Sequence, residues 1–366
     1  MTTSFLILLI GLQQLNAATV HDDDIEKRAA PRSPIVFPLM YSSSQPFIKG
    51  WLTSAAGSQA PTPFYGLMRT TCVNDGVSTD PIKQGQQVLW GATSAEPVTT
   101  SVRNNLFYRE DPKLATMCFK SPSVEGSAFS QLIKKAPNPV ISYWWDTSIP
   151  FGSKQAEDQV YGEMTIGGSN PSRFDASKSK KFRLVALSTD NIMDQEWTAQ
   201  EAETVKIGTD GREKSAEITF SPSSLVTLLP PDLYSSFVAP LNQQGPTSRV
   251  GSVDQNLQKR ARKPPVIFDC TDMRKLQPLF LGTIKIAPSK MVVQKGDGKC
   301  SVTVKSDTYI NPDGVILGND VLRHFHVAVT FNPNGDVLEL SARTDGEPPQ
   351  APATPQQPKR KTFGWF

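Results

Sequence analysis

Histidine is scarce in this sequence, and the residue patterns of several common enzyme classes are missing. The three histidines are His21, His324 and His326. There is no G-x-S-x-G nucleophile elbow, no H-E-x-x-H zinc motif and no glycine-rich nucleotide-binding pattern. His324 and His326 would share one face of a strand, and we favour packing over a metal site for this pair. Asp313 and Asp336 lie in turn sequences and are expected to form turns. No metal and no cofactor is therefore expected.

Long apolar runs are also missing, apart from a short one near the start. Residues Phe5 to Leu12 read FLILLIGL and are followed by the small residues Ala17 and Ala18, a pattern typical of a signal peptide. A membrane span needs about 20 apolar residues, so neither this run nor a later one predicts a membrane anchor. We expect residues 1–18 to be a signal peptide and the protein to be secreted and extracellular.

A polar stretch behind this run carries a candidate processing site. Residues 19–28 are interpreted as a propeptide ending in Lys27-Arg28, although chance dibasic pairs occur elsewhere in the chain. The formal charge of the whole chain is +3, and removal of four acidic and two basic residues would leave it mildly basic. No dense basic face is apparent, so neither nucleic acid nor a lipid surface is predicted as a partner.

Cysteine is rare but even in number. The chain has four cysteines, which allow three disulfide pairings in a secreted protein. We favour the sequential pairing Cys72–Cys118 and Cys270–Cys300, because each bridge then stays inside one half of the chain. Their spacing does not resemble a zinc site.

Most of the remaining sequence predicts short strands. Runs with two-residue alternation are separated by Pro, Gly, Asn and Ser, which favours a mostly β fold with a few short helices. We expect helices at Ser127–Lys135, Pro231–Val238 and Asp320–Phe325. Strand candidates are YGEMTIGG, KKFRLVAL, ETVKIG, SAEITF, GTIKIA, CSVTVKS, HVAVTF and DVLEL.

Two segments read as linkers or tails. Residues 243–265 are polar and end in a basic cluster of Lys259, Arg260, Arg262 and Lys263, which is interpreted as a solvated loop or as a site for an acidic partner. Residues 344–366 are rich in Pro and Gln and are expected to be a disordered tail. The exposed aromatic residues at its end would either dock on a partner or be unselected.

Three segments in the middle of the chain carry a resemblance to a known family. Ala128–Trp144 resembles the segment in which a helix precedes N-P-V-F-S in pepsin-like aspartic proteases. Tyr161–Asn170 resembles the hairpin G-x-L-T-x-G-G-x-D of that family, with Asn170 in place of Asp and with φ > 0 expected at Gly167 and Gly168. Glu196–Gly208 resembles the strand pair that follows.

The same resemblance continues through the region of the second catalytic motif. Residues Ile218–Leu225 occupy the frame A-[IV]-[VL]-D-[TS]-G-[TS]-S of the family. In this frame Phe220 stands at the catalytic Asp position, and Ser221, Pro222 and Ser223 occupy the rest of the loop. Cys270–Cys300 then resembles the disulfide-closed segment of the family, and Val315–Arg323 resembles its closing I-L-G strand and helix.

The resemblance covers Ser127–Arg343 and implies a pepsin-like two-lobed β fold with an incomplete N-terminal lobe. It places a degenerate N-terminal lobe at residues 29–139 and a C-terminal lobe at residues 140–343. No D-[TS]-G triplet occurs anywhere in the chain. The family hydrolyses peptides with one carboxylate from each lobe, and the two pKa values are pushed apart so that one group is an acid and the other a base. Phenylalanine can neither activate water nor donate a proton.

Three hypotheses about function follow from this resemblance. The first is a monomeric, catalytically inactive protein that binds a polypeptide in the groove between the lobes. The second is an active aspartic endopeptidase whose acids have not been recognised. The third is the product of a truncated or decayed protease gene.

Overall fold

The computed structural model describes residues 33–42, 45–53, 62–69, 87–93, 98–101, 106–107, 114–118, 128–148, 159–185, 197–222, 224, 226–242, 266–306 and 313–344. The expected signal peptide and propeptide, the basic cluster at 259–263, Cys72, Ser223 and the aromatic C-terminus lie outside these ranges. The described residues, which begin at Ser33, belong to one compact unit.

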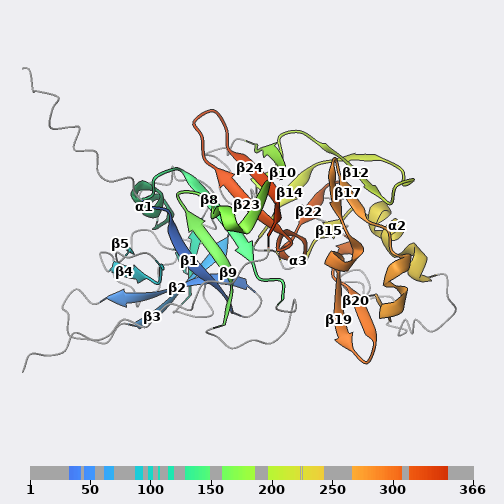
Figure 1. Cartoon of the computed structure of the whole chain (residues 1–366), viewed down its shortest axis with the longest axis horizontal. Coiled ribbons are helices and arrows are strands. Elements are labelled where there is room, and N and C mark those ends of the chain that lie inside the picture. Colours follow the sequence, from blue (N-terminus) through green and yellow to red (C-terminus); the bar gives the residue numbers. More distant parts are fainter. Residues whose placement is uncertain are drawn as a thin grey trace, which may run out of the picture. The chain divides into compact units, whose positions relative to one another are not determined.

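The largest sheet combines strands from both ends of this unit. Its order is β10-β24-β23-β8-β9-β1-β2-β3-β7-β6, and β4 and β5 branch from β2 (Figure 1). The boundary expected at residue 139 falls just before β8, which pairs with β9 and β23 inside this sheet. The strands are β1 (Ile35–Ser42), β2 (Gln45–Thr53), β3 (Thr62–Arg69), β4 (Gln87–Trp90), β5 (Val98–Ser101), β6 (Leu106–Phe107), β7 (Leu114–Cys118), β8 (Val140–Trp145), β9 (Val160–Ile166), β10 (Phe174–Arg183), β23 (Phe325–Thr330) and β24 (Val337–Arg343).

Three smaller sheets follow in the second half of the chain. The first has the order β11-β14-β22-β15-β21, the second β13-β12-β17-β18 and the third β16-β20-β19. Their strands are β11 (Trp197–Thr198), β12 (Glu203–Ile207), β13 (Lys214–Ala216), β14 (Ile218–Phe220), β15 (Leu228–Leu229), β16 (Ile267–Asp269), β17 (Leu279–Leu281), β18 (Ile284–Ile286), β19 (Val292–Gly296), β20 (Lys299–Val302), β21 (Lys305–Ser306) and β22 (Val315–Leu317).

Helices in the described residues are few and short, as the sequence predicts. They are α1 (Ala128–Lys135), α2 (Pro231–Asn242), α3 (Asn319–Leu322) and the 3₁₀ turns Pro171–Arg173, Cys270–Lys275 and Pro288–Met291. In α1 the apolar residues Phe129, Leu132 and Ile133 are buried. Lys134 and Lys135 lie in its last turn, where positive charges interact favourably with the helix dipole. None of these helices is long and apolar enough to cross a membrane.

The turns between strands confirm one sequence prediction and correct another. Gly167 has φ +97°, as expected for the turn after β9, whereas Gly168 does not adopt a positive φ. One left-handed residue is therefore sufficient there, and the prediction for Gly168 is wrong. The hairpin of β19 and β20 turns through Gly296, Asp297 and Gly298, all with positive φ.

The disulfide predicted in the second half is confirmed. Cys270 and Cys300 are bonded, with their Cα atoms 5.0 Å apart, and the bridge joins the turn after β16 to the neighbouring strand β20. The other pairing, Cys72–Cys118, stays a prediction because Cys72 is outside the described residues.

Candidate functional site

In the first of the smaller sheets, a central strand is flanked by two strands that follow each other in the chain. Strand β22 lies between β14, to which it is parallel, and β15, to which it is antiparallel. The connection from β14 to β15 therefore passes around the carboxyl end of β22. Parallel strands end at the same edge, so Ser221 and Gly318 lie together there, and the Ser221 backbone N–H donates to the Leu317 carbonyl over 2.9 Å. We call this edge the loop edge; its described residues are 220–222, 224, 226, 227 and 317–321.

Phe220 is the last residue of β14 and belongs to the hydrophobic core. Its side chain is fully buried, and its ring packs against that of Phe182 with centroids 4.9 Å apart. On the sheet it faces Trp197 across one pair and Leu317 across the other. Ser221 and Pro222, which follow Phe220, are also buried. The position therefore contributes packing and carries no ionisable group.

A buried hydrogen-bond network closes the loop edge. Thr227 Oγ1 accepts from the Gly318 backbone N–H over 3.0 Å and donates to Asp320 Oδ1 over 2.7 Å. Asp320 Oδ1 also accepts from the Val321 backbone N–H over 2.9 Å. A Cβ atom at Gly318 would lie 2.4 Å from the Val226 carbonyl carbon, so only glycine permits this close approach.

Asp320 is the one carboxyl group that the described residues bring to the loop edge. Its side chain is buried, and burial raises its pKa despite the hydrogen bond from Thr227. Asp320 therefore favours the protonated form more than an ordinary aspartate does, but no second carboxylate accompanies it to form a dyad.

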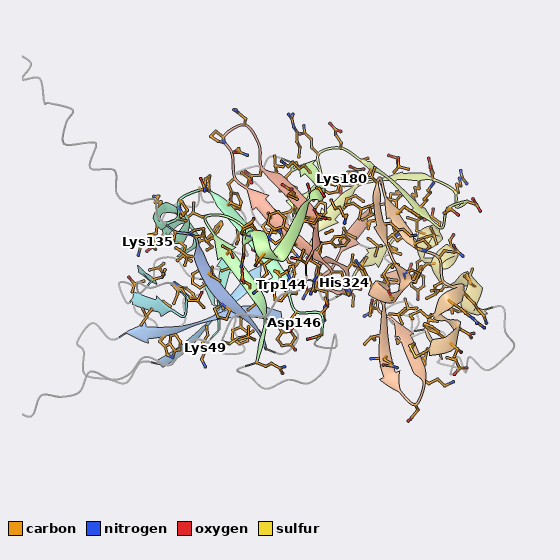
Figure 2. All side chains as sticks on the ribbon, viewed as in Figure 1. Lys49, Lys135, Trp144, Asp146, Lys180 and His324 are labelled. Atoms are coloured by element: carbon orange, nitrogen blue, oxygen red, sulfur yellow. A yellow bond between two sulfur atoms is a disulfide. The ribbon has the colours of Figure 1, made fainter. Side chains whose placement is uncertain are left out.

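The Asp-Thr-Ser triplet that follows β8 contacts Arg323 through the backbone carbonyl of Asp146 and not through its carboxylate. Asp146 is labelled in Figure 2 at the end of β8. Its carbonyl oxygen accepts from Arg323 Nη2 over 3.0 Å, while its carboxylate accepts from the Ser148 backbone N–H over 2.8 Å. Its side chain forms a local turn and shows no contact with Asp320.

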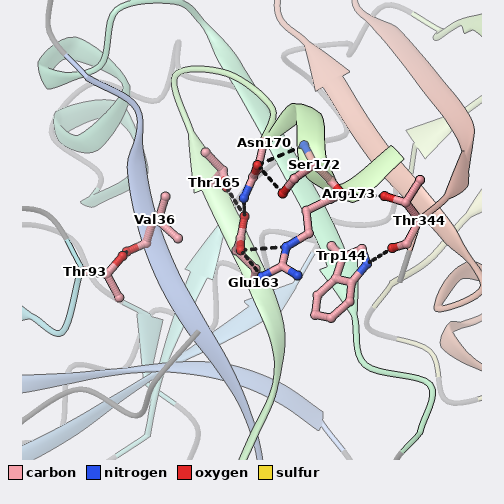
Figure 3. Close-up of polar contacts among 9 residues, drawn as sticks. All are labelled: Val36, Thr93, Trp144, Glu163, Thr165, Asn170, Ser172, Arg173 and Thr344. Carbon is pink, nitrogen blue, oxygen red and sulfur yellow. Dashed lines mark hydrogen bonds and ion pairs between the residues drawn. The ribbon is translucent and has the colours of Figure 1, made fainter. Parts of the chain in front are cut away.

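A second buried polar cluster lies on the large sheet (Figure 3). Glu163 Oε2 accepts from Nε and Nη2 of Arg173 over 3.1 and 3.0 Å, and the Arg173 guanidinium lies 4.0 Å from the Trp144 ring centroid. Asn170, at the position where the family resemblance expects Asp, donates to Glu163 Oε1 and caps the 3₁₀ turn through Ser172. Within this cluster the Glu163 carboxylate balances the charge of Arg173, and Arg173 and Asn170 donate to Glu163. We therefore assign the cluster a structural role.

The remaining candidates of the sequence are structural. The ring of His326 is buried and stacks on Phe174 with centroids 4.3 Å apart, which supports packing over metal binding. Asp336 Oδ1 accepts from the Asn332 backbone N–H in a turn, as predicted. Asp313 is exposed and pairs with Lys214 over 3.3 Å.

Comparison with known proteins gives a structural likeness alone. No family model matches the sequence, and no curated protein matches it. The aspartic proteinase from Irpex lacteus is similar in structure, with a TM-score of 0.54 and 13% sequence identity. The match covers 85% of this chain and 98% of that proteinase. The likeness shows the fold, and it confirms the pepsin-like β fold that the sequence resemblance implied.

The extent of this match exceeds the part of the sequence that carries the resemblance. Residues 127–343 make up a little over half of the chain, whereas the structural match covers 85% of it. The tail after Arg343 is too short to supply the difference. Residues of the N-terminal half therefore take part in the shared fold although no motif in their sequence indicates it.

Proposed function

We propose that this chain is a secreted protein that keeps the fold of an aspartic proteinase without its chemistry and acts by binding a polypeptide. The observation that carries the proposal is the buried phenylalanine at the end of β14. In the family frame this position holds a catalytic aspartate, and here the Phe220 ring is packed against Phe182 in the core. A ring in this environment supplies neither an acid nor a base.

The loss on the other side of the reaction supports the same conclusion. The chemistry needs two carboxylates that share a proton across a bound water, and the sequence has no D-[TS]-G triplet from which either could come. Asp320 is buried and bonded to Thr227, which suits it to hold the loop edge together rather than to activate water. These features argue against the alternative of an active endopeptidase.

The alternative of a truncated gene product is less well supported than a folded binding protein. The structural match extends over 98% of the Irpex lacteus proteinase, which argues against the loss of a large part of the fold.

The test uses purified mature protein and denatured casein as the probe, between pH 3 and pH 7. We expect saturable binding of casein peptides with no cleavage, by mass spectrometry, and no effect of a statine-type inhibitor on the peptide pattern. Cleavage that the inhibitor blocks would overturn the proposal.

Two matched variants identify the source of any cleavage. Asp320→Asn removes the buried carboxyl at the loop edge, and Asp313→Asn makes the same change at an exposed turn. Inhibitor-sensitive cleavage that is lost in the first variant and kept in the second would establish the active alternative, with Asp320 as an acid. Failure of casein peptides to bind at any pH would refute the binding function.

A further inference from the structure

A pocket near the loop edge is lined by cationic side chains, two of which, Lys290 and His324, also line an adjoining pocket together with Asp320. Its volume is about 370 Å³, it lies between β10, β18, β24 and the segment around Lys290, and none of the described residues that line it is acidic. No residue of the loop edge lines it either. The ionisable side chains that line it are Lys178, Lys180, Lys285, Lys290, His324 and Arg343. We call this the cationic pocket; Figure 2 labels Lys180 and His324 among its residues.

Only part of this positive charge is balanced by carboxylates. Lys178 pairs with Asp175 over 3.1 Å and Lys180 pairs with Glu203 over 2.5 Å. Lys285 and Lys290 have no ion pair within the described part of the chain. The Lys290 Nζ atom lies over an aromatic ring, 4.9 Å from the centroid of Phe325.

Arg343 adds a guanidinium that the backbone holds in place. Its Nη1 atom donates to the Trp145 carbonyl over 2.7 Å, which orients the group without neutralising its charge. A guanidinium presents its donors in a rigid, planar fork. Because the bond to Trp145 already fixes the orientation of this fork, less entropy is lost when a ligand binds.

The cations of this pocket repel one another, and this repulsion contributes to the lowered pKa values of two of its residues. The pKa of His324 is lowered to about 3 by burial first and then by Arg323, Lys290 and Arg343. The pKa of Lys290 is lowered by burial and by the charge of Arg343. A negative charge in the pocket would reduce this repulsion, which favours the binding of an anion.

We propose that the cationic pocket binds an oxyanion of the phosphate or sulfate type, carried by a small organic group. Lys290, Arg343 and the neutral His324 ring offer N–H donors of the kind that such oxygens accept. The apolar residues Phe325 and Leu340 line the same pocket and would contact the organic part. The volume lies at the lower end of the range for small-ligand sites.

Calorimetry with inorganic phosphate, sulfate and phosphoserine tests the proposal, with chloride used to keep the ionic strength constant. We expect saturable binding of the oxyanions by the full mature protein, and tighter binding of phosphoserine than of inorganic phosphate. Equal binding of the two would indicate a site for the free ion, without a role for the apolar lining. No saturable binding of any oxyanion would overturn the proposal.

Matched lysine variants separate the pocket from general charge effects. Lys290→Met should weaken phosphate binding at least about tenfold, since it removes one close cation. Lys181→Met removes the same charge from β10, but this lysine does not line the pocket and pairs with Glu339, so binding should be unchanged. Lys285→Met removes another lysine that lines the pocket and should also weaken phosphate binding. Because Lys285 is exposed, this change carries little risk to folding. Equal loss in the Lys181 and Lys290 variants would refute the assignment.

The His324 ring gives a second readout that does not depend on affinity. Its pKa, followed by NMR, should rise from about 3 when phosphate is added at constant ionic strength, because a bound anion stabilises the imidazolium. An unchanged pKa under saturating phosphate would place the anion elsewhere and overturn the proposal.

Discussion

Replacing Phe220 with aspartate would place an acid at the end of β14, and its effect on stability measures how fully this position belongs to the core. Removal of a buried Phe side chain costs about 3–5 kcal/mol, and Phe220 is completely buried against Phe182. A carboxylate in the same place has no partner, so burial would raise its pKa. We expect Phe220→Asp to lower the free energy of unfolding by at least about 3 kcal/mol and to restore no proteolysis, even combined with Pro222→Gly.

The pH dependence of this loss has a defined sign. The pKa of the new carboxyl would be higher in the folded than in the unfolded state, so the folded state would bind more protons and stability would fall as pH rises. The loss relative to wild type should therefore be larger at pH 7 than at pH 4, by about 1.4 kcal/mol for each unit of pKa difference.

Urea denaturation at both pH values measures these differences, and two variants serve as controls. Phe220→Leu keeps an apolar side chain and should lose much less stability. Val185→Asp introduces the same charge at a position that is 43% exposed and should change stability by less than about 0.5 kcal/mol. If Phe220→Asp were as stable as wild type at pH 7, the core environment of Phe220 would be refuted, and measurable proteolysis would reveal a partner acid.

Three further substitutions test the groups that stabilise the fold. The pKa of buried His326 is lowered to about 4, so stability should fall by up to about 3 kcal/mol as pH drops from 6.5 toward 4, and His326→Phe should remove this share in urea titrations across pH. The pKa of Asp320 is raised, so stability should decline as pH rises through it, and Asp320→Asn should flatten that slope; an unchanged slope would show an accessible carboxyl. Gly318→Ala, whose Cβ would meet Val226 at 2.4 Å, should cost about 2–3 kcal/mol, whereas Gly168→Ala, with 3.3 Å of clearance, should cost less; thermal unfolding compares the two.

Local patterns predicted most described elements from residue 127 onward. The helix expected at Ser127–Lys135 is observed at Ala128–Lys135, and the strand runs correspond to β9, β12, β14, β20, β23 and β24. The helix expected to end at Val238 continues to Asn242, because Leu241 packs against the core and stabilises the last turn. The periodicity of apolar residues indicates which face of an element is buried. It does not show where a tertiary contact, such as that of Leu241, prolongs a helix.

Pairing between distant segments could not be read from periodicity. Strand β1 pairs with β9 and β23 pairs with β8, and no local signal specifies either partner or register. The same holds for the site. Phe220 was placed at the catalytic position by the family frame, whereas its packing against Phe182 required the structure. The bond between Thr227 and Asp320 joins residues 93 positions apart.

The loop edge explains how the fold accommodates a phenylalanine at position 220. The parallel pairing of β14 with β22 uses backbone groups, and the close approach at Gly318 requires only the absence of a side chain. The network of Thr227, Gly318 and Asp320 does not include position 220. An aspartate there must be kept at the cost of burying charge, whereas a phenylalanine gains about 2–3 kcal/mol from burial. Stability therefore favours the aromatic residue at position 220, and the surrounding architecture needs no compensating change.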